Sequence, residues 1–74
     1  GFEFMMNALR LTGGFDLNLF EQRTGLNPSA ISKQLNEAEK KGLLTQTLNA
    51  QHHVIIEPTI MGQRFLNELL QIFL

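Results

Sequence analysis

The sequence has 74 residues, no cysteine, 43% hydrophobic residues and a net charge of −1. A chain of this length forms one small domain, and without cysteine it has neither disulfide bonds nor zinc–thiolate sites to stabilise it. The slight acidic excess counts against a compact nucleic-acid-binding domain, which usually carries a basic excess. We recognise no signal peptide and no apolar run long enough to span a bilayer, so we expect no membrane partner.

The first predicted element is a helix from Phe2 to about Leu11. Its apolar residues recur at helical spacing on two adjoining faces: Phe2, Met5, Met6 and Leu9 on one, and Phe4, Ala8 and Leu11 on the other. Gly13 and Gly14 follow, and glycine adopts the left-handed conformation of a helix C-cap at little cost. We therefore expect the helix to end before these glycines.

A second helix is predicted over Leu17–Thr24. Asp16 precedes it and is a favourable N-cap residue, because its side chain can accept a hydrogen bond from a free N–H of the first turn. Gly25 permits a tight turn after the helix, and we expect Leu26 to fill that turn.

A third helix is predicted from Pro28 to about Lys41. Asn27 is its expected N-cap, and proline is well tolerated at the first helical position, where its missing N–H costs nothing. Gly42 is expected to end the helix. The whole segment 16–42 therefore has the layout of a helix-turn-helix.

Two strands and a final helix complete the chain. The β-branched content predicts a hairpin, or wing, with strands over Leu43–Leu48 and His53–Glu57 joined by a turn at Asn49–Gln51. Thr59 is expected to cap a helix over Ile60–Phe73. The order helix, helix, helix, strand, strand, helix predicts a single winged helix-turn-helix domain over residues 1–74, mainly helical with a small β-hairpin.

The predicted last helix has an apolar stripe of residues spaced by four: Met61, Phe65, Leu69 and Phe73. Gly62 lies early in this helix, where we interpret it as a site of close packing. The first and last helices together carry more apolar residues than such a small core can use. We expect the surplus to dock against a partner domain, and the apolar end Ile72-Phe73-Leu74 favours a piece of a larger protein.

The sequence contains no recognisable catalytic or metal-binding pattern. Ser29 and Ser32 have no histidine near them in the sequence, and Ser29 fits the role of a first-turn residue. His52 and His53 are neighbours on a strand, so they point to opposite faces, and Glu57 adds little to either. We interpret both histidines as part of a solvated wing tip, and we predict no catalytic, cofactor-binding or metal-binding residue.

The third helix is the one that would read DNA in a winged-helix regulator. Its three lysines are offset by two glutamates, whereas DNA affinity depends on several cations on one face. Lys33–Glu37 and Glu37–Lys41 have the spacing of ordinary surface pairs. A DNA-binding regulator domain remains the alternative function, if a dimer or an adjoining basic domain supplies the missing charge.

Several motifs together carry a family likeness. They are EFMMNALRL at 3–11, GF at 14–15, FEQRTG at 20–25, GLL at 42–44, PT at 58–59, Gly62, and RFLN at 64–67. With these motifs the chain resembles the C-terminal domain of oxygen-independent coproporphyrinogen III oxidase-like (HemN/HemW-type) radical SAM proteins. The likeness covers nearly the whole chain, and its opening is more similar to the heme-handling branch of that family.

The resemblance implies a non-catalytic accessory fragment of a cytoplasmic protein of heme or porphyrin biosynthesis, or of heme chaperoning. In the family a preceding catalytic domain uses S-adenosylmethionine and holds an iron–sulfur [4Fe–4S] cluster on three closely spaced cysteines. The C-terminal domain packs against it, and porphyrin or heme is met through the parent protein, which is an oxidoreductase or a heme-handling relative. This chain has no cysteine and therefore carries no cluster of that kind.

Two further hypotheses follow from the resemblance. Arg10 and Asn7, on the most motif-like helix, are candidates for an interdomain hydrogen-bond network, with bracing of the local fold as the simpler interpretation. The second hypothesis is that His52 or His53 is a heme ligand. A solvated wing tip is again the simpler interpretation of these two residues.

Overall fold

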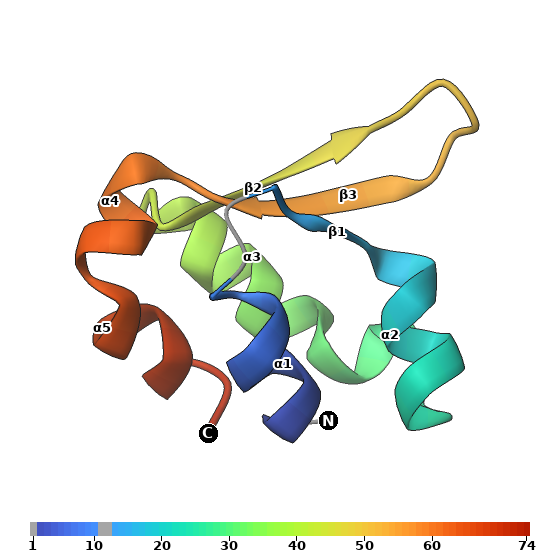
Figure 1. Ribbon diagram of the computed structural model, residues 1–74, viewed down its shortest axis with the longest axis horizontal. Coiled ribbons are helices and arrows are strands. Elements are labelled where there is room, and N and C mark those ends of the chain that lie inside the picture. Colours follow the sequence, from blue (N-terminus) through green and yellow to red (C-terminus); the bar gives the residue numbers. More distant parts are fainter. Residues whose placement is uncertain (1, 11–12) are drawn as a thin grey trace.

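The structure is a computed structural model that describes residues 2–10 and 13–74 (Figure 1). Its elements, in chain order, are α1 (Phe2–Ala8), β1 (Phe15–Asp16), α2 (Leu17–Thr24), the 3-10 helix η1 (Pro28–Ile31), α3 (Ser32–Lys40), β2 (Leu44–Leu48), β3 (Val54–Pro58), α4 (Ile60–Arg64) and α5 (Leu66–Gln71). The predicted winged helix is confirmed. The first helix ends at Ala8, earlier than the predicted end near Leu11, and Leu9 and Arg10 form a turn; Leu11 itself lies outside the described residues.

The sheet has one strand more than the sequence predicted. β2 and β3 form the expected antiparallel hairpin, with Leu44 opposite Pro58 and Leu48 opposite Val54. The short β1 pairs with the other edge of β3, which places Phe15 opposite Ile56 and gives the order β1-β3-β2. A strand of two residues has no periodicity to read in a sequence, so only its partner reveals it.

The core lies between the sheet and the helices, which gather on one side of it (Figure 1). Its largest fully buried side chains come from α1, α2, α3, α5 and the two long strands, together with Leu9 after α1: Met5, Leu9, Phe20, Leu35, Leu44, Ile56 and Leu69. Phe4 adds edge-to-face contacts to Phe15 and Phe20, with ring centroids 5.4 and 5.6 Å away. These contacts join α1 to both β1 and α2.

The predicted helix caps are present. Asp16 accepts a hydrogen bond from the Asn18 N–H, Asn27 from the Ser29 N–H, and Thr59 from the Gly62 N–H. The predicted third helix begins with the 3-10 turn η1 before it becomes α-helical. Strand β3 begins one residue later than predicted and includes Pro58.

Two packing expectations are wrong. Leu26 does not fill the turn, because 44% of it is exposed; the Thr24 hydroxyl organises the turn by donating to the Phe20 carbonyl and accepting from the Leu26 N–H. The last helix is interrupted at Phe65, whose φ of −111° and ψ of 47° are not helical. Because of this break, residues spaced by four before and after it no longer lie on one continuous helix face. Met61 and Phe65 are half-exposed, whereas Leu69 and Phe73 are buried.

The packing role expected for Gly62 is confirmed. A Cβ at this position would overlap the carbonyl oxygen of Leu43 and lie 2.9 Å from its carbonyl carbon. The absent side chain therefore allows α4 to lie directly on the backbone that leads into β2.

Candidate functional site

The exposed face of α3 is partly engaged by the wing. The side-chain amide of Gln46 on β2 donates to the side-chain oxygens of Asn36, at 3.0 Å, and Glu39, at 2.9 Å. Glu37 pairs with Lys41 at 3.4 Å, as its spacing predicted, whereas the described residues contain no pair between Lys33 and Glu37. Part of the polar face that would meet DNA in a winged-helix regulator, namely Asn36, Glu37 and Glu39, therefore makes internal contacts here.

The two wing histidines have different environments. His52 lies in the turn with a φ of 63° and is exposed, in agreement with a solvated wing tip. The side chain of His53 is 43% exposed, so it remains partly solvated, but its Nδ1 lies 2.7 Å from a carboxylate oxygen of Asp16. His53 is therefore tied to the start of α2 rather than free at the wing tip. Among residues 2–10 and 13–74, no three histidine or acidic side chains are grouped closely enough to hold a metal ion.

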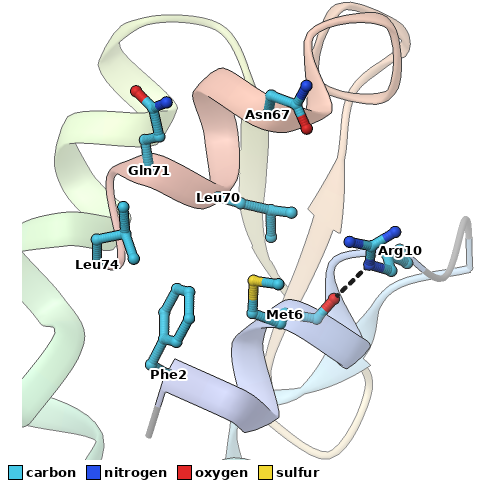
Figure 2. Close-up of a pocket in the computed structure, with 7 residues that line it drawn as sticks. All are labelled: Phe2, Met6, Arg10, Asn67, Leu70, Gln71 and Leu74. Atoms are coloured by element: carbon cyan, nitrogen blue, oxygen red, sulfur yellow. Dashed lines mark hydrogen bonds between the residues drawn. The ribbon is translucent and has the colours of Figure 1, made fainter.

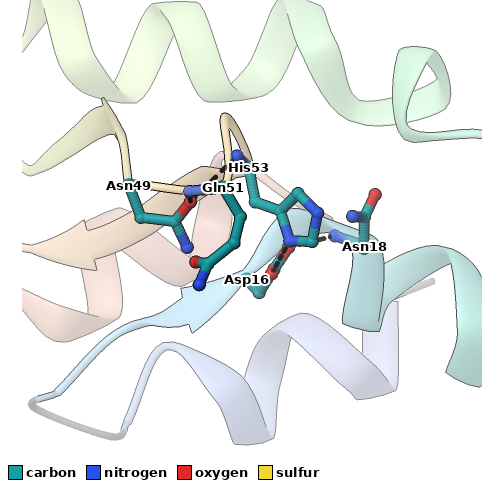
Figure 3. A network of polar contacts seen from close by, with 5 residues as sticks. All are labelled: Asp16, Asn18, Asn49, Gln51 and His53. Carbon is teal, nitrogen blue, oxygen red and sulfur yellow. Dashed lines mark hydrogen bonds and ion pairs between the residues drawn. The ribbon is translucent and has the colours of Figure 1, made fainter.

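Asp16 and Asn49 organise a polar network at the base of the wing turn (Figure 3). Asn49 accepts hydrogen bonds from the backbone N–H groups of Gln51 and His53. Asp16 uses one carboxylate oxygen for the Asn18 N–H, at 2.8 Å, and the other for His53. Since an ionised carboxylate only accepts, the His53 Nδ1 carries the shared proton. The sequence identified Asp16 as a cap, but its partner depends on the pairing of β1 with β3.

These contacts shift the titration of Asp16. The hydrogen bond from the Asn18 N–H is the main cause that holds the pKa of the Asp16 carboxyl below its ordinary value of 3.8. Desolvation opposes it, and the hydrogen bond and charge interaction with His53 lower the pKa further. A carboxyl with a lowered folded-state pKa stabilises the fold above its unfolded pKa, and this contribution is lost as the pH falls through the folded value.

We therefore expect Asp16→Asn to reduce the free energy of unfolding at neutral pH, even though asparagine caps helices as well as aspartate does. The difference from the wild type should shrink at pH values below 3.8, where the wild-type carboxyl also becomes neutral. Urea denaturation of both proteins across the acid range measures this. If the difference in unfolding free energy between the two proteins stays constant into strong acid, the charge of Asp16 does not contribute to stability.

A groove runs between α1 and α5 (Figure 2). We call it the α1–α5 groove; its volume is about 310 Å³, and it is lined by Phe2, Met6, Arg10, Asn67, Leu70, Gln71 and Leu74. Met6 and Leu70 face each other across it, while Phe2 and Leu74, which are 37% and 81% exposed, lie at one end. Arg10 lies at the other end, where its Nε donates to the Met6 carbonyl at 3.1 Å. This is the surplus apolar surface that the terminal helices were expected to expose.

The structure separates the two residues proposed for an interdomain network. Arg10 lines the α1–α5 groove, whereas Asn7 lines a different hollow of about 380 Å³, together with Phe4, Ala8, Phe15, Leu19 and Arg23. The bond from Arg10 to the Met6 carbonyl also supports the simpler bracing role for this residue. Asn7 and Arg10 therefore do not form one cluster.

A second exposed apolar patch lies on and beside α4. It consists of Ile60, Met61 and Phe65. In the described part of the chain, no helix has the length and hydrophobicity needed to cross a membrane.

Comparison with known protein families explains the motifs. Residues 1–50 match the family described as the HemN C-terminal domain. The chain belongs to this family. It is 40% identical over 73 residues to the heme chaperone HemW of Haemophilus influenzae and 36% identical over 73 residues to the heme chaperone HemW of Buchnera aphidicola. These matches cover 99% of this chain but only 18% of each relative, so the chain spans less than a fifth of their length.

A solved structure from a different class of protein has a similar fold to this HemN C-terminal domain. A MarR-family transcriptional regulator from Rhodococcus sp. RHA1 superimposes with a TM-score of 0.70 over 96% of this chain and 51% of the regulator. The sequences are 24% identical. This likeness supports the winged-helix architecture and, at such low identity, says nothing about function.

Proposed function

We propose that this chain is the non-catalytic C-terminal accessory domain of a cytoplasmic radical SAM protein, and that it packs on the catalytic domain preceding it in the same polypeptide. The observation that carries the proposal is the match of residues 1–50 to the HemN C-terminal domain. Both relatives named above are heme chaperones, which favours heme handling by the parent over coproporphyrinogen III oxidation.

The residues of this chain do not fit a [4Fe–4S] site of the family's kind. Such clusters are held by cysteine thiolates, and the chain has no cysteine. The cluster, S-adenosylmethionine and any chemistry on porphyrin would therefore belong to the preceding domain, where a Cys-x3-Cys-x2-Cys run is expected. The contribution of this domain would be to pack on the preceding domain and to stabilise it.

The alternative of a DNA-binding regulator has less support. The lysines of α3 are offset by glutamates, and Gln46 engages Asn36 and Glu39 on that helix. Since phosphate neutralisation dominates DNA affinity, we propose no nucleic-acid partner, and we also propose no membrane partner. Micromolar binding to duplex DNA that weakens steeply with salt would contradict this.

A deletion in the full-length protein tests the accessory role. We expect the full-length protein from which this domain has been deleted to keep the same iron and acid-labile sulfide content per chain as the intact protein. The deletion removes no cysteine and therefore no cluster ligand. Both proteins would be reconstituted anaerobically, and circular dichroism would confirm that the shortened one is folded. Loss of the cluster from a folded, shortened protein would place this domain in the cluster site and contradict the proposal.

A further inference from the structure

We infer that the α1–α5 groove is the face that packs on the preceding domain of the same polypeptide. This inference rests on the proposed function and specifies the surface through which it acts. The occupant is the part of the parent chain N-terminal to this domain, and not a second copy or a separate protein.

The course of the chain identifies the occupant. Phe2 lines the groove, so the polypeptide that leads into α1 arrives at the edge of the groove itself. The start of α1 and the segment after α5 also lie on the same side of the molecule (Figure 1). Since the family is a C-terminal domain and the relatives are more than five times longer, a large part of the parent is tethered at this edge. A tethered domain is present at a high effective concentration next to the groove, so the preceding domain is the favoured occupant.

The chemistry of the groove suits a protein surface. Stable interfaces have an apolar centre and a polar rim. Here Phe2, Met6 and Leu74 supply the accessible apolar surface over the buried Leu70, and Asn67 and Gln71 lie beside them. Within the described residues, no carboxylate forms an ion pair with Arg10. Its remaining guanidinium N–H groups would suit a carboxylate or backbone carbonyls of the preceding domain.

The α4 patch of Ile60, Met61 and Phe65 is the competing surface. It is at least as exposed as the groove, but α4 lies near the sheet, away from the start of α1 and the segment after α5 (Figure 1). A domain tethered at Phe2 reaches the groove without crossing the body of the molecule. The groove, rather than α4, is therefore the face next to the point of attachment.

Hydroxyl-radical footprinting of the intact full-length protein distinguishes the two surfaces. Phe2 and Phe65 make a matched pair, because they are the same residue type and are 37% and 49% exposed in this domain. With each rate normalised to the same residue in the unfolded protein, we expect oxidation of Phe2 to be about fivefold slower than that of Phe65, since the preceding domain would cover Phe2 and keep water and radicals from its ring.

Two other results would overturn the inference in different ways. If Phe65 is protected and Phe2 is as reactive as its exposure here predicts, the domain packs through α4: the proposed function survives and the groove assignment fails. If both phenylalanines react as exposed side chains, the domain does not pack on its parent through either surface, and the proposed packing fails with it.

Discussion

Gly62→Ala should lower the free energy of unfolding by about 3 kcal/mol or more, a cost typical of severe overpacking. The new Cβ would overlap the carbonyl oxygen of Leu43, and backbone on both sides would have to shift. This is a large part of the total stability expected for a domain of this size, which is roughly 4–11 kcal/mol. Helix propensity alone predicts the opposite sign, because alanine is favoured over glycine by about 1 kcal/mol inside a helix.

Gly13→Ala is the matched control for this variant. A Cβ at Gly13 meets nothing within 4 Å, and its φ is not positive. We therefore expect a change of less than about 0.5 kcal/mol, as for most surface substitutions. Urea denaturation of the three proteins measures both effects. If Gly62→Ala is neutral or stabilising, α4 does not lie against the backbone at Leu43 as described.

Phe20→Ala should cost about 3–5 kcal/mol, the usual range for a fully buried phenylalanine. The side chain is 0% exposed and contacts the edge of Phe4, so its removal leaves a cavity where α1 meets α2. Thermal and urea unfolding, followed by circular dichroism, would show a strongly destabilised or unfolded protein.

The control for Phe20→Ala is Phe65→Ala, the same substitution at a residue that is 49% exposed. Its cost should stay below about 1.5 kcal/mol, because little apolar surface leaves a buried environment. A similar loss of unfolding free energy in the two variants would mean that Phe65 lies in the core, as its helical spacing with Leu69 suggested. The helix would then continue through residue 65 without a break.

The elements with strong local signals were predictable from the sequence. Caps at Asp16, Asn27 and Thr59 depend on side chains that bond to backbone a few residues away, so the sequence places them directly. The wing was predictable for the same reason, since a run of β-branched residues is bounded by turn residues. The family motifs and the missing cysteines also belong to the sequence alone, and they limit what chemistry this domain can perform.

The candidate site was less predictable, because it depends on residues that are distant in the sequence. The Asp16–His53 contact needs β1 to pair with β3, and the α1–α5 groove needs the first and last helices to lie side by side. The break at Phe65 is likewise invisible in the sequence, because an apolar spacing of four predicts one continuous helix there.

The sequence by itself determined the caps, the winged-helix class, the family and the order of elements except for β1 and the break between α4 and α5. Only the tertiary structure decided which apolar residues are surplus: Phe20 and Leu69 are buried, whereas Phe2, Phe65 and Leu74 remain in contact with solvent. The physical reason is that burial depends on which faces of distant elements meet, and a short chain offers more apolar faces than its own core can cover.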